Sequence, residues 1–189
     1  MMSQTRMQVL PLATIVLAML VLAPAMVVSQ GYSVSFTVAG LPSGLRTQYY
    51  LDGVLNGTIQ LGETRQLNLP LGGVHTLSVD SMVSGTNATR YLCKDNLWSF
   101  TQTGTHVFTY KTQYHLEVIS TYGSPTGTDW YDEGATAYVR ITTNMTSGPE
   151  GVRYVFVRWE GDASGEGMTS EPIIMDRPKK ALAAWKTQY

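Results

Sequence analysis

The sequence predicts an all-β protein, with two small tandem β-domains of sandwich or roll type behind an N-terminal signal helix. Three observations lead to this prediction. Apolar and polar residues alternate along segments such as 32–38, which is the period of a strand with one face on a core. Turn-forming residues recur at short intervals, and no helical pattern follows residue 30. The tetrapeptide Lys-Thr-Gln-Tyr occurs at 111–114 and again at 186–189, which indicates a repeated unit.

Residues 1–29 predict a secretory signal peptide. One positive charge, Arg6, precedes an uncharged apolar run over 9–28, and small residues suited to cleavage stand at positions 23, 25 and 29. An uncleaved signal anchor is the alternative, because the run is long enough to span about 30 Å of hydrocarbon. Either form puts the rest of the chain outside the cytoplasm, so we expect an extracellular or cell-surface location.

The remaining chain has little net charge and one cysteine. Without Arg6, 12 basic residues stand against 14 acidic ones, a net charge of −2. A nucleic-acid partner needs a concentrated basic surface, so this class of partner is excluded. Cys93 has no internal disulfide partner. We expect it to be a small buried apolar residue, with an intermolecular bridge as the alternative.

The repeated tetrapeptide divides the chain into β-domains at about 30–112 and 113–189. The first opens with the strand 32–38, whose apolar face carries Tyr32, Val34, Phe36 and Val38. The second opens with the alternating strand 115–119. Between 49–51 and 54–55, Asp-Gly at 52–53 predicts a tight hairpin, since both residue types tolerate positive φ.

The second unit carries an ordered set of landmarks. They are Tyr114-His-Leu-Glu-Val, Trp130-Tyr-Asp-Glu-Gly-Ala-Thr-Ala-Tyr-Val139, Trp159-Glu-Gly-Asp162, Met175-Asp-Arg-Pro-Lys179 and Ala183-Ala-Trp185. This order resembles divergent InlB B-type repeats, also called bacterial surface repeats. The first unit matches less well, since no Gly-Asp follows Trp98. The resemblance implies tandem β-domains on secreted or cell-surface proteins, archaeal ones included, that act as spacers, adhesive modules or assembly units. It implies no catalytic residue.

No group of residues predicts catalysis, so we expect neither an enzyme nor a cofactor. His75, His106 and His115 lie far from any metal-binding spacing, and we expect them to face solvent as polar strand residues. The segment Gly-Asp-Ala-Ser-Gly at 161–165 lacks the spacing of a nucleophile elbow, and no helix follows it. We interpret it as a turn.

Two acidic clusters keep calcium open as a minority alternative. They are Asp129, Asp132 and Glu133 in one turn, and Glu160, Asp162 and Glu166 in another. Neither cluster has the register of a calcium loop, so no metal site is predicted. The competing interpretation is that Asp162 caps its own turn through the backbone.

Four tryptophans could either fill the cores or form a sugar-binding platform. They are Trp98, Trp130, Trp159 and Trp185. Exposed coplanar rings would stack on a sugar. Core packing is favoured, because each Trp falls at a core-like position and small domains need large buried aromatics.

Three N-glycosylation sequons begin at Asn56, Asn87 and Asn144, in polar stretches typical of turns. In an exported chain we expect at least one to be modified.

Two classes of function remain. The first is a secreted structural protein, a filament or pilus-like subunit that associates with itself head to tail by β-strand addition. The second copy of the tetrapeptide motivates it, because the first copy leads into a strand and the second offers a place for a neighbour. Tyr32, Val34, Phe36 and Val38 would form the donor strand, unless that strand pairs within its own domain. The alternative is an extracellular adhesive or glycan-binding β-module.

Overall fold

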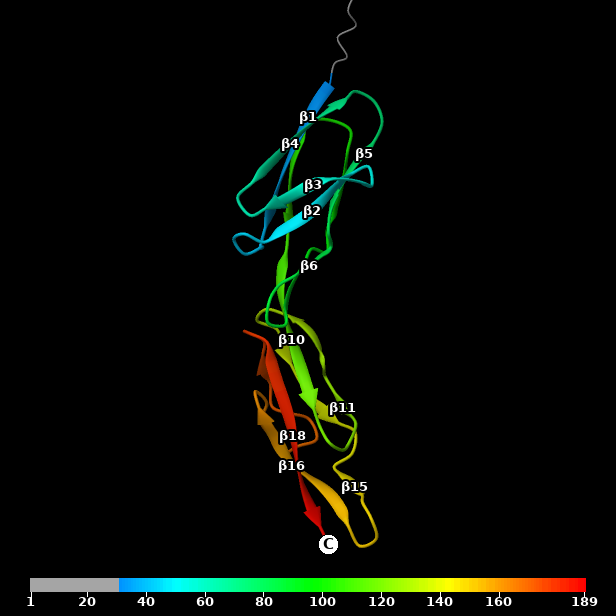
Figure 1. Cartoon of the computed structure of the whole chain (residues 1–189), viewed down its shortest axis with the longest axis vertical. Helices are drawn as coiled ribbons and strands as arrows, with labels where there is room; N and C mark the ends of the chain where they lie inside the picture. Colours follow the sequence, from blue (N-terminus) through cyan, green and yellow to red (C-terminus); the bar gives the residue numbers. More distant parts are fainter. Residues whose placement is uncertain (1–30) are drawn as a thin grey trace, which may run out of the picture.

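The computed structural model describes residues 31–189, so the predicted signal peptide at 1–29 lies outside the described residues. These residues fold entirely as strands and connecting turns, which confirms the all-β prediction. A search of the same residues for a helix long and apolar enough to span a membrane finds none. Figure 1 shows an elongated molecule, with the strands of residues 31–110 at one end and most of those of residues 111–189 at the other. We call these the N-terminal half and the C-terminal half.

The N-terminal half contains two sheets. The three-stranded sheet has the order β4–β1–β9, with β1 (Gly31–Ala39), β4 (Thr64–Pro70) and β9 (Gly104–Thr109). The four-stranded sheet has the order β3–β2–β5–β8, with β2 (Arg46–Leu51), β3 (Val54–Gln60), β5 (His75–Val79) and β8 (Leu97–Phe100). Two short strands, β6 (Met82–Ser84) and β7 (Thr89–Leu92), form a hairpin outside these sheets.

The C-terminal half is organised around a seven-stranded sheet that also takes in the β6–β7 hairpin. Its order is β15–β16–β18–β10–β7–β6, and β12 pairs with the other edge of β10. The long strands are β10 (Lys111–Ile119), β16 (Arg153–Gly161) and β18 (Lys179–Gln188), and the short ones are β12 (Asp129–Asp132) and β15 (Met145–Ser147). Two-stranded ladders join β11 (Pro125–Thr126) to β14 (Arg140–Ile141) and β13 (Thr136–Ala137) to β17 (Ile173–Ile174).

Buried apolar side chains form two separate clusters, one in each half. The first includes Phe36, Ile59, Leu77 and Phe108, and the second includes Leu116, Ile141, Trp159 and Met175. Two clusters are what a division into two β-domains requires, although β10 and the β6–β7 hairpin belong to one sheet that crosses the boundary. The division at 112/113 therefore stays a prediction, with the two cores in its favour.

The predicted strand at 32–38 and the predicted hairpin at 52–53 are confirmed. Asp52 and Gly53 have φ of 50° and 79° and join β2 to β3, as the hairpin prediction requires. Along β1, Tyr32, Val34, Phe36 and Val38 are buried, while the residues between them are partly exposed. The apolar alternation alone was enough to orient this strand, because a slip of one residue would turn its whole apolar face to water.

Candidate functional site: a repeated strand joint

The first strand of each half has the same neighbours. β1 pairs antiparallel with β4 and parallel with β9, and β10 pairs antiparallel with β12 and parallel with β18. Val34 lies opposite Gly104, and Leu116 lies opposite Lys179. Tyr32 and Tyr114, each two residues before these positions, are therefore structural counterparts.

A hairpin is also repeated, once in each half. In β6–β7, Met82 lies opposite Leu92, and in β15–β16, Met145 lies opposite Val155. Both copies read Met-x-Ser-Gly, then four residues, then Arg-Tyr. The backbone N–H of the glycine donates to the carbonyl four residues later at 2.9 Å in each. This motif was not among the sequence-based predictions, although its identical residues at identical spacing are visible in the sequence.

Each hairpin pairs with one copy of the Lys-Thr-Gln-Tyr segment. Gln113 lies opposite Arg90, and Gln188 lies opposite Arg153. The Nε of the arginine donates to Oε1 of the glutamine at 2.8 Å in both places. We call the unit of β6–β7 with 111–114 the first joint and the unit of β15–β16 with 186–189 the second joint.

The first joint holds the C-terminal half through polar side chains. Gln113, only 7% exposed, accepts from Arg90 and donates from Nε2 to Oδ1 of Asp132 at 2.6 Å. The guanidinium of Arg90 lies 4.6 Å from the ring centroid of Trp130, a cation–π contact. One arginine and one glutamine of the joint thus bind two of the four residues of the neighbouring β12, Trp130 and Asp132.

Two backbone hydrogen bonds complete the first joint. The N–H of Glu133 donates to the carbonyl of Thr112 at 2.9 Å, and the N–H of His115 donates to the carbonyl of Ala88 at 3.1 Å. Backbone bonds of this kind depend on strand geometry and not on side-chain identity.

Tyr110 anchors the strand that leaves the N-terminal half. Its hydroxyl donates to the carbonyl of Asp80 at 2.6 Å and contacts Oγ1 of Thr47 at 2.8 Å. Burial raises the pKa of this phenol well above its usual range. Gly40 packs so closely here that a Cβ would lie 1.9 Å from the Tyr110 carbonyl oxygen. The start of the joint is therefore fixed by both hydrogen bonds and backbone packing.

The second joint has the same internal contacts but a more exposed surface. Arg153 is exposed, whereas Arg90 is half-buried, and Tyr189 is 99% exposed. Gly151, Val152, Arg153 and Tyr189 line an open hollow of about 400 Å³. Among the described residues, no strand occupies the place that β12 takes at the first joint.

The prediction that the histidines face solvent is wrong, because all three rings are half-buried among aromatic or charged neighbours. His106 stacks on Trp98 with ring centroids 5.0 Å apart, and burial lowers its pKa. His115 packs against Trp130 at 5.2 Å. Nδ1 of His75 lies 2.7 Å from Oδ2 of Asp52.

The His75–Asp52 pair is a structural contact at the hairpin turn. Asp52 accepts from the N–H of Thr76 at 2.8 Å, and this bond, with His75, lowers the pKa of the carboxyl. Both of these partners of Asp52 lie on β5, so the carboxylate ties the turn between β2 and β3 to that strand.

The acidic clusters are engaged by protein groups. In residues 31–189 no three His, Cys, Asp or Glu side chains gather as metal ligands. Asp132 accepts from Gln113, and Glu133 accepts from Tyr114 at 3.2 Å. Asp162 binds the N–H of Lys180 at 2.9 Å and the guanidinium of Arg177. The interpretation of Asp162 as a cap of its own turn is therefore wrong, since the carboxylate holds the start of β18.

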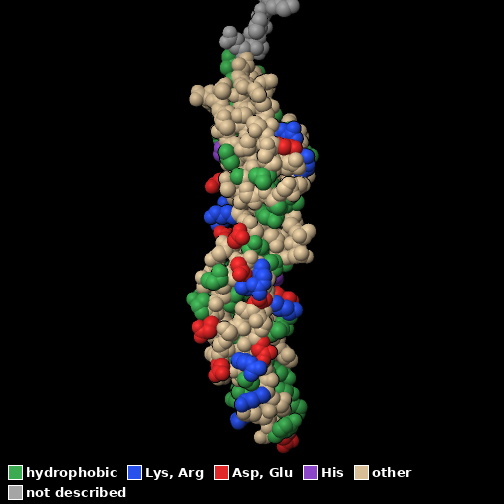
Figure 2. All heavy atoms as spheres, turned by 90° about the vertical axis from the view of Figure 1, so that its left-hand side faces the viewer, with side chains coloured by type: hydrophobic (Ala, Val, Ile, Leu, Met, Phe, Trp, Pro, Cys, Tyr) green, Lys and Arg blue, Asp and Glu red, His purple; other side chains and the backbone are tan. Residues whose placement is uncertain are grey.

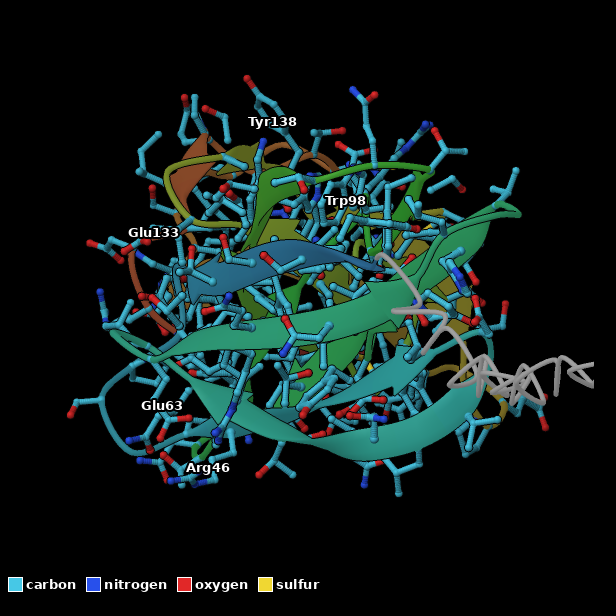
Figure 3. The ribbon with its side chains drawn as sticks, turned by 90° about the horizontal axis from the view of Figure 1, so that it is seen from above. Arg46, Glu63, Trp98, Glu133 and Tyr138 are labelled. Carbon is cyan, nitrogen blue, oxygen red and sulfur yellow. The ribbon has the colours of Figure 1, made fainter. Side chains whose placement is uncertain are left out.

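Three of the four tryptophans pack in or against the two cores, as predicted, whereas Trp130 belongs to neither core cluster. Trp159 is buried, Trp98 and Trp185 pack against the two cores, and Trp130 lies half-buried under Arg90. The exposed aromatic away from the second joint is Tyr138, 52% exposed, which projects outward in Figure 3.

All three sequon asparagines are exposed, which modification requires. Asn87 lies in the turn of β6–β7 and Asn144 between β14 and β15. Asn56 lies within β3, so its predicted turn position is wrong. Cys93 is a free thiol, 1% exposed, as predicted, and burial raises its pKa.

Comparison of the chain with protein-family models gives no match, and the searches of curated proteins and of solved structures give none either. The likeness to surface repeats therefore stays a prediction from the sequence.

Proposed function

We propose that this chain is a secreted, cell-surface structural protein that associates with itself head to tail by β-strand addition, as the subunit of a filament. One observation carries the proposal. The joint that connects the two halves recurs, with the same register and the same Arg–Gln hydrogen bond, in the second half. A connection that already joins one β-unit to the next is suited to joining a further unit, and head-to-tail contacts that do not close generate filaments.

Most of the side chains described above pack in the cores or bind other side chains of the protein, as a structural role requires. The largest buried residues are apolar, and the polar side chains of the first joint bind one another. Charged side chains of both signs are interspersed on the face shown in Figure 2, without a single-sign patch that would attract a nucleic acid.

β1 is the proposed donor strand. In the single chain, Tyr32, Val34, Phe36 and Val38 fill the core of their own half, between β4 and β9. Strand addition can therefore take two forms. Either β1 stays in its own half and presents its first residues to a neighbour, or the whole strand is exchanged between copies and fills the same slot in another chain.

Sedimentation velocity and negative-stain electron microscopy of the exported protein, over a wide range of concentration, test the proposal. We expect concentration-dependent, unbranched polymers. Monodisperse monomers at every concentration would reject the filament function.

An adhesive or glycan-binding module is the second candidate, and the exposed ring of Tyr138 is the observation in its favour. Stacking on sugar needs an exposed aromatic face. A glycan array with the wild-type protein and a Tyr138→Ala variant would detect this activity, and binding that the variant loses would support it.

A further inference from the structure

We infer that the second joint binds the N-terminal end of a second copy of this chain, with β1 and β4 of that copy in the places that β10 and β12 take at the first joint. This inference rests on the proposed self-association and names the two surfaces that make it.

The structural equivalence of β1 and β10 indicates that the N-terminal half of a second copy binds at the second joint. β1 has the same two kinds of neighbour as β10, and Tyr32 is the counterpart of Tyr114. The start of β1 in another copy can therefore take the place at the second joint that the strand leaving the first joint, β10, takes there.

Two backbone carbonyls at the second joint correspond to the two that accept hydrogen bonds from the C-terminal half at the first joint. The carbonyl of Thr187 corresponds to that of Thr112, and the carbonyl of Gly151 corresponds to that of Ala88, since the registers of both hairpins agree. At the first joint these two carbonyls accept the bonds that cross to the C-terminal half.

The pairing register of β1 with β4 identifies the backbone N–H groups of the second copy that would donate to these carbonyls. Pro70 lies opposite Gly31 as Asp132 lies opposite Gln113. The N–H of Leu71 is therefore the counterpart of the N–H of Glu133, and that of Ser33 is the counterpart of His115. The two backbone bonds can form even though the side chains differ.

The joined strand would be built from two chains. The first copy supplies Lys186–Gln188, paired with β16, and the second copy continues from Tyr32. Tyr189 of the first copy would overlap with Tyr32 of the second. Because Tyr189 is 99% exposed, moving it aside loses almost no packing.

Exposed apolar side chains at both surfaces favour the contact. Leu71 and Val74, in the turn between β4 and β5, are 61% and 67% exposed, and Met145, in strand β15 of the second joint, is 50% exposed. Covering them removes apolar surface from water. Asn68 of the second copy takes the place of Trp130, where its amide oxygen can accept from Arg153.

A cysteine pair across the contact tests the inference. Single variants Thr187→Cys and Leu71→Cys are mixed under mild oxidation, and we expect a disulfide between chains. Both positions are exposed, and cross-strand pairs in hydrogen-bonded register lie within disulfide reach. Figure 1 places the turn after β4 and the end of β18 at opposite ends of the molecule, so a link within one chain is excluded. Buried Cys93, with its raised thiol pKa, reacts poorly.

Three controls make the result specific. Thr112→Cys with Glu133→Cys in one chain should close the equivalent bridge at the first joint. Thr187→Cys mixed with Leu61→Cys, which is exposed but lies in another turn, should give no dimer. Adding Arg153→Ala should slow the Thr187–Leu71 link about tenfold, the effect of losing one charge-assisted hydrogen bond, whereas Arg90→Ala should not.

The outcomes separate the inference from the proposed function. Polymers that form without the Thr187–Leu71 disulfide would overturn the inference alone. Monomers under all conditions, with no disulfide, would overturn both.

Discussion

Replacing Gln113 by alanine removes a buried side chain that links the two halves at the first joint. Gln113 is 7% exposed, accepts from Arg90 at 2.8 Å and donates to Asp132 at 2.6 Å. A hydrogen bond to a charged group contributes about 1.5–3 kcal/mol. Water can reach half-buried Arg90 and Asp132 and recover part of this. We therefore expect the variant to lower the free energy of unfolding by about 2–4 kcal/mol.

Gln188→Ala is the matched control, because it changes the same residue type in the same tetrapeptide. Gln188 makes one such bond, to exposed Arg153. Exposed pairs contribute at most about 1 kcal/mol, so the control should be nearly neutral.

Urea unfolding followed by tryptophan fluorescence, at a concentration where the protein is monomeric, measures both variants. The reasoning holds if Gln113→Ala is the more destabilised by about 2 kcal/mol. Equal losses in the two variants would refute it, since the buried bridge between the halves would then contribute nothing.

Three further predictions concern the N-terminal half. Gly40→Ala should cost more than about 3 kcal/mol, from positive φ and a backbone clash, whereas Gly44→Ala, with open space around it, should cost about 1–2 kcal/mol in the same unfolding assay. Burial lowers the pKa of His106 from the ordinary histidine value of 6.5, so near and below pH 6.5 the unfolded chain binds more protons than the folded chain. The unfolding temperature should therefore fall as the pH drops through this range, and it should fall less steeply in His106→Gln. Ser35 and Thr105 lie opposite each other on β1 and β9, so the double variant Ser35→Cys with Thr105→Cys should close a disulfide within one chain. In a mixture of the two single variants, an interchain disulfide on a non-reducing gel would show that β1 is exchanged between copies.

Local patterns in the sequence predicted the parts of the fold that depend on neighbouring residues. The alternation at Tyr32–Val38 oriented β1, and Asp52-Gly53 located a hairpin. The two copies of Lys-Thr-Gln-Tyr pointed to the joints, because both copies pair with the same kind of hairpin.

Contacts between distant residues could not be predicted in the same way. Arg90 meets Gln113 across 23 residues, and Arg153 meets Gln188 across 35. The two hairpins are 63 positions apart while the two tetrapeptides are 75 apart, so the intervening segments differ in length and hide the repeat. The histidines were misassigned because their half-burial comes from rings on other strands, such as Trp98 against His106.

Cryo-electron microscopy of the assembled protein, at a resolution that traces the backbone, tests the central claim most directly. The account predicts that hairpin β15–β16 and Lys186–Gln188 of one molecule meet β1 and the turn after β4 of the next, with the register of the first joint. Contacts through the sides of the molecule, with the second joint left open to solvent, would contradict it.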